Sequence, residues 1–205
     1  LLDAGVDVIA HSVRDQAVDD SLIEKMLQQN VPYIPTLTRD LARFVYETRP
    51  AFLDDPFFLR RVNAYQGDVD LVTGSDYQAT SRSPQRQADK GGLEQGSQNL
   101  KTVSDAGVII AMGSDSGTNP GQWQRYFEHT EIEMMVEAGM STTQALVAAT
   151  GGAAEAMGLD QDVGVLQPGR WADLLVLNAN PLEDIRATRE IDSVWIAGRP
   201  LDDLP

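Results

Sequence analysis

The sequence contains no cysteine, and histidine occurs only twice, at His11 and His129. The absence of cysteine excludes disulfide bonds and thiolate metal sites. A transition-metal site in this chain would therefore depend on carboxylates, or on ligands from outside the chain. Proteins without cysteine occur inside cells and among exported bacterial proteins, so this absence does not identify a compartment.

Basic residues are also scarce, with 16 Lys and Arg against 31 Asp and Glu and a net charge of −15. This balance argues against nucleic acid as a partner, because phosphate binding needs clustered Lys and Arg. No apolar run is long enough to span a membrane, and the first residues lack the basic start and cleavage site of a signal peptide. We expect a soluble protein, either cytoplasmic or exported. Because its first residues resemble the end of a helix, the chain looks like a piece of a longer one.

Three short apolar segments predict strands, at Val6–His11, Tyr33–Leu37 and Val108–Ser114. Residues Arg49–Ser83 are expected to form an irregular excursion with short helices, of the kind that often makes a lid over a site. Apolar residues at helical spacing predict the remaining helices. Their expected bounds are Asp19 or Asp20 to Asn30, Arg39–Glu47, Pro84–Ala106, Gln124–Glu137 and Ser141–Gly158. This alternation indicates an α/β protein with a parallel sheet.

The sequence changes character in its last segment. Strands are expected at Ala172–Leu177 and Ile191–Ala197, and no helix of useful length separates them. This pattern indicates β structure appended to an α/β body. We therefore divide the chain into residues 1–160 and residues 161–205.

Two residues with metal-binding side chains stand at predicted strand ends. His11 closes the strand VDVIAH, and Asp115 closes the strand VIIAMGSD. Reactive groups in parallel α/β folds collect at the C-terminal ends of strands, and imidazole nitrogen and carboxylate oxygen are both good zinc ligands. The residues alone leave two simpler interpretations open. A lone strand-end histidine is often a hydrogen-bonded structural residue, and an aspartate in GSDSG is often a turn or cap residue.

The order of motifs resembles that of the amidohydrolase superfamily. AGVDVIAHS, followed by DDSLIEKMLQQNVPYIPTL, resembles strands six and seven of the barrels related to imidazolonepropionases and proline-type dipeptidases. AGVIIAMGSDSG resembles strand eight, EHTEIEMMVEAGMSTTQALVAATGGAAEAMGL the helices after it, and GVLQPGRWADLLVLNANPLEDI the strand that re-enters a small β-sandwich. The resemblance implies the C-terminal portion of a TIM-like (β/α)8 barrel, about strands six to eight, plus part of a β-sandwich domain.

The resemblance also implies roles for two residues. His11 matches the strand-six histidine, which binds the second metal in binuclear members and lies beside the metal-bound water in mononuclear ones. Asp115 matches the strand-eight aspartate, which binds the first metal and takes a proton from the attacking water. The implied cofactor is a divalent metal, zinc being the expected ion, with one or two ions bound. The implied substrate is a small amide or a dipeptide-like molecule.

Several ligands of the family have no counterpart in this sequence. The His-x-His of strand one, the lysine of strand four and the histidine of strand five would precede Leu1. The three lysines, Lys25, Lys90 and Lys101, all fall in predicted helices. Three strands also cannot close an eight-stranded barrel. The missing half of the barrel would come from the same gene product or from a second chain, and homo-oligomers remain open. The chain by itself is expected to be catalytically incomplete.

The remaining candidates have structural interpretations. His129 is expected to be a surface or supporting residue of a helix, and Asp54 and Asp55 a turn and a helix start. Trp171 and Trp195 are expected to pack the two parts of the chain together. Three functions compete at this point. They are a metal-dependent hydrolase of C–N bonds, a non-catalytic binding fragment derived from such an enzyme, and a doubly wound nucleotide-binding protein. The last lacks a glycine fingerprint and basic residues.

Overall fold

The computed structural model describes residues 2–60 and 65–201. Strands β1 (Ile9–Ala10) and β2 (Tyr33–Ile34) pair in parallel. Tyr33 also forms a parallel bridge with Ile110, so the extended segment of residues 108–114 lies on the other side of β2. We call it the Ile110 segment. The parallel direction of the three predicted segments is confirmed, with β2 in the middle. The third segment pairs through an isolated bridge at Ile110 and is not a regular strand.

The regular pairing is shorter than the sequence predicted. Val6–His11 pairs only at Ile9–Ala10, and Leu37 belongs to helix α2 (Leu37–Leu41) rather than to a strand. Pro35 has no N–H to donate to a neighbouring strand. The backbone of Thr36 then adopts a left-handed conformation, with φ of 50°. The chain therefore leaves the sheet directly after β2, and α2 ends before the predicted Glu47.

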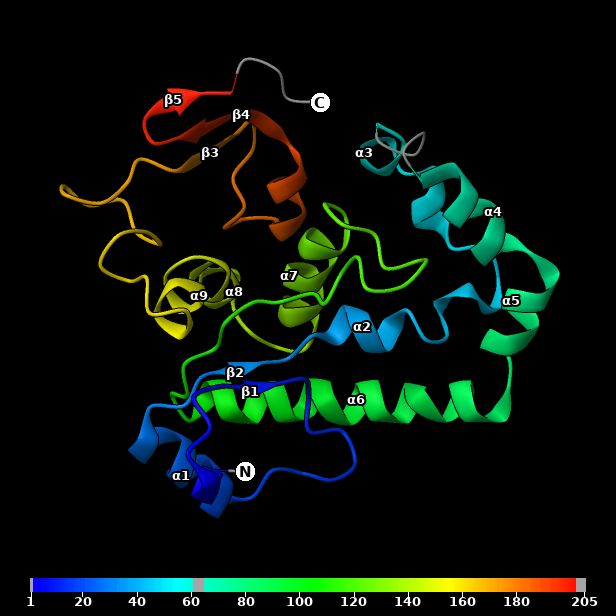
Figure 1. Cartoon of the computed structure of the whole chain (residues 1–205), viewed down its shortest axis with the longest axis horizontal. Coiled ribbons are helices and arrows are strands. Elements are labelled where there is room, and N and C mark those ends of the chain that lie inside the picture. Colours follow the sequence, from blue (N-terminus) through cyan, green and yellow to red (C-terminus); the bar gives the residue numbers. More distant parts are fainter. Residues whose placement is uncertain (1, 61–64, 202–205) are drawn as a thin grey trace.

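Helices cover the parallel strands, as Figure 1 shows. The long helix α6 runs beneath them, α1 lies at one side, and α7, α8 and α9 stand between the strands and the C-terminal sheet. The bounds are α1 Asp20–Gln29, α6 Pro84–Asp105, α7 Phe127–Glu137, α8 Thr142–Ala149 and α9 Gly151–Ala156. Asp19 caps α1 by accepting a bond from the Leu22 N–H at 2.7 Å, which is the capping that its sequence predicted.

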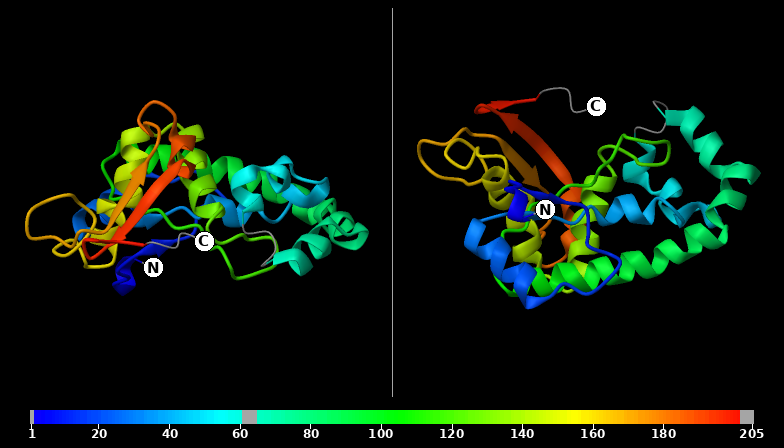
Figure 2. Two further views of the ribbon diagram at one scale, coloured as in Figure 1. Left: turned by 90° about the horizontal axis from the view of Figure 1, so that it is seen from above. Right: turned by 60° about the horizontal axis from the view of Figure 1, so that its bottom comes forward.

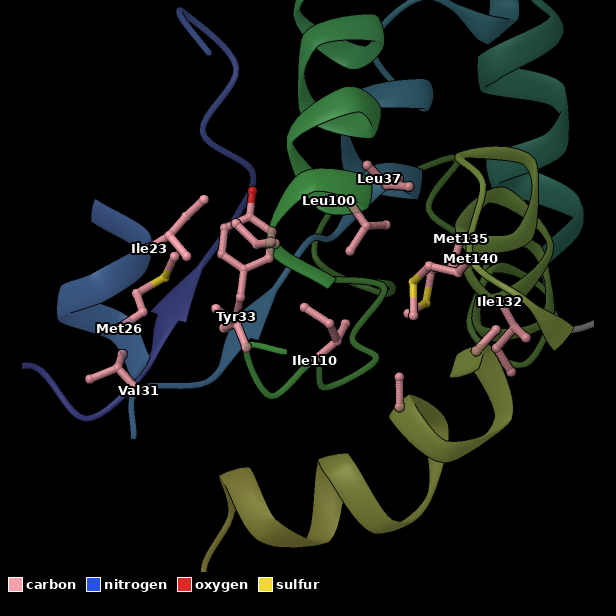
Figure 3. Packing of buried hydrophobic residues seen from close by; sticks show 14 of the residues in the cluster. Ile23, Met26, Val31, Tyr33, Leu37, Leu100, Ile110, Ile132, Met135 and Met140 are labelled. Atoms are coloured by element: carbon pink, nitrogen blue, oxygen red, sulfur yellow. The ribbon is translucent and has the colours of Figure 1, made fainter. Parts of the chain in front are cut away.

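A single apolar cluster lies between these helices and the strands. Figure 3 shows Tyr33 of β2 between Ile23 and Met26 of α1 on one side and Leu100 of α6 on the other. Tyr33 and Leu100 are fully buried. Burying apolar surface of this kind supplies most of the free energy that favours folding. The cluster therefore holds the three strand ends in fixed relative positions.

Two helix boundaries differ from the predicted ones. Helix α7 begins at Phe127 instead of Gln124, because Arg125 has a φ of 70° and cannot be part of a right-handed helix. The helix predicted from Ser141 to Gly158 is broken at Thr150, whose φ and ψ are −128° and −89°. The break lets Ala148 accept a hydrogen bond from the Met112 N–H at 2.8 Å.

The predicted excursion forms a second, aromatic cluster. Its elements are η2 Val45–Glu47, η3 Ala51–Asp54, α3 Pro56–Leu59, α4 Gln66–Thr73 and α5 Ser75–Ser81. Tyr46 and Phe58 pack there against Trp123 and Phe127 from the main body. The excursion is therefore packed against the loop that follows the Ile110 segment.

The C-terminal part forms an antiparallel sheet in the order β3 (Leu174–Leu177), β4 (Ile191–Ile196) and β5 (Arg199–Pro200). Figure 2 shows this sheet and helices α4 and α5 at opposite ends of the molecule. The short helix η5 (Ile185–Arg189) returns to the body, where Ile185 joins the main apolar cluster. The expectation for Trp171 is wrong, because its side chain is 61% exposed. No helix in the described segments is long and apolar enough to cross a membrane.

Candidate functional site

The candidate site lies where the three parallel strands end. His11 directly follows β1, and its backbone N–H donates to the Ile34 carbonyl of β2 at 2.9 Å. Asp115 directly follows the Ile110 segment. Because all three strands run in parallel, His11 and Asp115 lie at the same end of the sheet, on either side of the turn that follows β2. The position of both residues at the same end of the sheet is the one that the sequence predicted.

The turn after β2 contacts both residues. The Thr36 hydroxyl lies 2.8 Å from Nδ1 of His11. Three residues later, Nε of Arg39 lies 3.3 Å from a carboxylate oxygen of Asp115. The segment Thr36–Arg39 therefore connects the two candidate ligands, although neither Thr36 nor Arg39 was singled out from the sequence.

A buried carboxylate holds this turn in place. Glu131 of α7 is fully buried and accepts hydrogen bonds from the backbone N–H groups of Leu37 and Thr38, both at 2.7 Å. The Thr38 hydroxyl bonds to the same carboxylate at 2.7 Å and to the Ser114 carbonyl at 3.0 Å. Burial raises the pKa of Glu131 to about 7, although its bonds with Thr38 and Leu37 oppose this shift.

A second carboxylate anchors the arginine. Asp40 is buried and contacts Arg14 at 2.5 Å and Arg39 at 3.2 Å. Burial raises the pKa of Asp40, and the two guanidinium groups act in the opposite direction. The arginines thus supply the pairing that a buried carboxylate needs.

The loop after Asp115 is bounded by Glu128 of α7. The Ser114 hydroxyl contacts one oxygen of Glu128 at 3.1 Å, and the Ser116 hydroxyl contacts the same oxygen. Beyond this point, a cavity of about 240 Å³ lies between the loop and the excursion. Its lining includes Tyr65, Asp68, Thr118, Asn119, Trp123 and Gln124. This cavity is a place next to the strand ends where part of a small molecule could bind.

The other candidates lie away from the strand ends. His129 is half-buried on α7, with Nδ1 3.0 Å from the Thr188 hydroxyl. Burial, with a smaller effect of Arg189, lowers the pKa of His129 to about 4, so the ring is neutral near pH 7. Asp55 caps α3 by accepting from the Phe57 N–H at 2.7 Å, as its sequence predicted. The hydrogen bonds of His129 and Asp55 therefore support the structural interpretation of both residues.

The strand ends fit part of a metal site. The exposed imidazole of His11 and the half-buried carboxylate of Asp115 are donors that divalent metals accept. Among residues 2–60 and 65–201, no group of three or more His, Asp or Glu side chains could hold a metal ion.

Comparisons with known proteins agree with this geometry. The model of the amidohydrolase family matches residues 11–201. An imidazolonepropionase of Deinococcus deserti is 36% identical over 102 residues, which are 48% of this chain and 25% of that protein. An ochratoxinase of Aspergillus niger is 37% identical over 99 residues, which are 46% of this chain and 19% of that protein.

A solved structure shows a similar arrangement over almost the whole chain. It is a protein of Bifidobacterium longum assigned as a prolidase, with a TM-score of 0.67 and 32% identity. The alignment covers 98% of this chain and 43% of that protein. The chain therefore spans less than half the length of the relatives that it matches. These findings leave no support for the doubly wound nucleotide-binding alternative.

Proposed function

The chain belongs to the amidohydrolase family, and from this premise we propose that it is the C-terminal part of a metal-dependent hydrolase of C–N bonds. The bond would lie in an amide, a cyclic amide or a dipeptide, and water would be the attacking group. The names of the similar proteins, imidazolonepropionase and prolidase, support this class of substrate. The observation that carries the proposal is the position of His11 and Asp115 at one end of the parallel strands.

The proposed cofactor is a divalent metal, zinc by preference, with one or two ions. When bound, such an ion lowers the pKa of water and polarises a carbonyl group. His11 would offer Nε2, because its Nδ1 is already engaged with the Thr36 hydroxyl at 2.8 Å. That bond also fixes the orientation of the ring, which is a common way of positioning a metal-binding histidine.

Asp115 would have two tasks in this proposal. Its carboxylate would contribute a ligand, and a carboxylate oxygen would accept a proton from water and return it to the leaving nitrogen. The left-handed backbone at Asp115, with φ of 55°, carries the side chain at the strand end. In the structure this carboxylate is paired with Nε of Arg39 at 3.3 Å.

The remaining ligands are proposed to lie in a segment that completes the barrel. Residues 1–160 would supply strands six to eight, and residues 161–205 part of a β-sandwich domain. The partner segment would bring a His-x-His, a lysine and a histidine, from the same gene product or from a second chain. Zinc sites use three or more protein ligands, so the two residues of this chain are not sufficient.

Activity measurements on two forms of the protein test this proposal. The chain of 205 residues alone should not hydrolyse amides or dipeptides, and the complete protein should. In the complete protein, Asp115→Asn should reduce kcat by about 100-fold or more, because an amide is a poor proton relay. Asp105→Asn is the matched control, because Asp105 ends α6 and its ion pair in the described part of the chain is with Lys101 at the surface.

Two outcomes would contradict the mechanism. They are substantial hydrolysis by the chain alone, and normal turnover by the Asp115→Asn variant of the complete protein. A complete protein that hydrolyses none of these substrates would instead favour the alternative of a non-catalytic binding fragment.

A further inference from the structure

Arg39 is anchored through both its backbone neighbours and its guanidinium group. It follows Leu37 and Thr38, whose backbone N–H groups are both bonded to the buried Glu131 at 2.7 Å. Its guanidinium group is anchored through Nη1, 3.2 Å from Asp40. The side chain is nevertheless 29% exposed. A fixed and accessible guanidinium group at the strand ends is suited to binding a ligand.

Asp40 does not depend on Arg39 for its neutralisation. Arg14 contacts the same oxygen of Asp40 at 2.5 Å, which is closer than the 3.2 Å of Arg39. Removing Arg39 would therefore leave the buried Asp40 paired. The function of Arg39 therefore concerns the other side of its guanidinium group, where Nε lies 3.3 Å from Asp115.

The charges at this point balance only while Asp115 is available. Arg14 and Arg39 carry two positive charges, and Asp40 and Asp115 carry two negative ones. If the carboxylate of Asp115 serves a metal ion, as in the proposed function on which this inference rests, Arg39 loses its second partner. One positive charge then faces the strand ends without an anion.

We propose that Arg39 binds a carboxylate of the substrate, so that the preferred substrates are N-acyl amino acids or dipeptides with a free C-terminal carboxylate. The planar guanidinium group can bind a carboxylate through two parallel hydrogen bonds, which a lysine cannot do. No bond from Nη2 of Arg39 occurs within the described segments. Nε and Nη2 are adjacent on one edge of the guanidinium group, so the edge now turned to Asp115 is the one that receives the substrate.

Calorimetric titration tests this proposal without any turnover. The complete protein carrying Asp115→Asn is freed of metal, which removes the competing carboxylate and leaves Arg39 available. N-acetyl-L-leucine and N-acetyl-L-leucinamide are the two probes, since they differ only in a carboxylate and its neutral amide. The acid should bind at least about 10-fold more tightly than the amide, as expected for a hydrogen-bonded charge.

Further variants of the metal-free Asp115→Asn protein test whether Arg39 is the residue that binds the carboxylate. Arg39→Met should abolish the preference for the acid, and Arg39→Lys should retain only part of it. Arg43→Met is the matched control, because Arg43 has nearly the same exposure, 28% against 29%, but pairs with Asp89 of α6. Unchanged circular dichroism and melting temperature would show that each variant is folded. The proposal would be overturned if the Asp115→Asn protein with Arg39 intact bound the acid and the amide equally well. It would also be overturned if that protein bound neither probe measurably.

A separate kinetic experiment distinguishes this inference from the proposed function. In the complete, metal-loaded protein, Arg39→Met should lower kcat/KM for dipeptides by about 10- to 100-fold. The corresponding dipeptide amides should be affected much less. Equal losses for dipeptides and their amides would overturn the role of Arg39. Failure to hydrolyse either class would remove the proposed function, while the titration would still decide what Arg39 binds.

Discussion

Three residues that follow the parallel strands adopt a left-handed backbone conformation, although none of them is glycine. They are His11, Thr36 and Asp115, with φ of 71°, 50° and 55°. The conformation is unfavourable for most residues, and more so for β-branched ones such as Thr36. Such strain persists only where surrounding contacts impose it, and it is concentrated at functional sites. Here the contacts come from the bonds of Thr36 with His11 and of the next residues with Glu131.

The buried Glu131 should make the stability of the fold depend on pH. Its pKa is raised from 4.5 to about 7, mainly by burial, so the folded state favours the protonated form. This contribution to stability is complete below pH 4.5 and is lost as the pH rises to about 7. A shift of this size corresponds to roughly 3 kcal/mol. Urea denaturation of the complete protein at a series of pH values should show a falling midpoint over this interval.

The Glu131→Gln variant provides the control. It should be less stable by about 1–3 kcal/mol, because an amide cannot accept all the bonds from Leu37 and Thr38. Its midpoint should also vary less between pH 4.5 and about 7. A variant with the parent's pH profile would show that Glu131 does not titrate in this interval.

The sequence indicated only part of the candidate site. His11 and Asp115 could be found because each ends an apolar strand within a recognisable motif. Arg39 and Glu131 could not, because their roles depend on contacts between distant segments. Glu131 and its partner Leu37 are 94 residues apart. One signal was present, since Glu131 precedes the buried Met135 by one helical turn and so lies on the same face of α7.

At the scale of elements, the break between α8 and α9 brings a helix close to the Ile110 segment. Gly152 packs against this segment so tightly that a Cβ atom would overlap the carbonyl oxygen of Ile110. A backbone oxygen cannot move away as a flexible side chain can. The neighbouring Gly151 has no such restriction, because a Cβ atom added there would lie 3.7 Å from the nearest atom, the carbonyl oxygen of Gly164.

Two glycine-to-alanine variants of the complete protein should therefore behave in opposite ways. Gly152→Ala should lower the free energy of unfolding by about 1–3 kcal/mol through overpacking. Gly151→Ala should be neutral or raise it by up to about 1 kcal/mol, because alanine favours helix. Urea denaturation measures both changes. A Gly152→Ala protein as stable as the Gly151→Ala protein would contradict the close packing of α9.

The elements themselves were largely predictable, and their boundaries were not. Apolar runs and caps located β1, β2, α1 and α6 because these signals are local. The start of α7 depended on the left-handed Arg125, and the break at Thr150 on the docking of Ala148 to Met112. Such features arise from tertiary packing, which periodicity along the chain does not contain.

At the scale of the whole molecule, large apolar side chains remain exposed. Leu166 is 84% exposed, Met157 72% and Val147 55%. Val147 also lines a hollow of about 630 Å³ that runs along Val108 and Ile110. Apolar surface of this kind favours association. We propose that the segment that completes the barrel covers the open edges of the parallel strands, next to β1 and to the Ile110 segment.

The chain alone should therefore associate in solution. Analytical ultracentrifugation should show oligomers or aggregates of the isolated chain, and a uniform species for the complete protein. The isolated chain should also bind more of an apolar dye per residue than the complete protein does. A monodisperse chain without dye binding would contradict the idea that its sheet edge is normally covered.

The central claim is that His11 and Asp115 are ligands of a metal centre that another segment completes. Metal content of the purified complete protein, measured by inductively coupled plasma mass spectrometry, tests it most directly. The parent protein should contain one or two divalent ions per chain, and His11→Ala and Asp115→Asn should each lose part or all of this metal. His129→Gln, which changes the other histidine, should retain it. Full metal content in both the His11 and Asp115 variants would contradict the account.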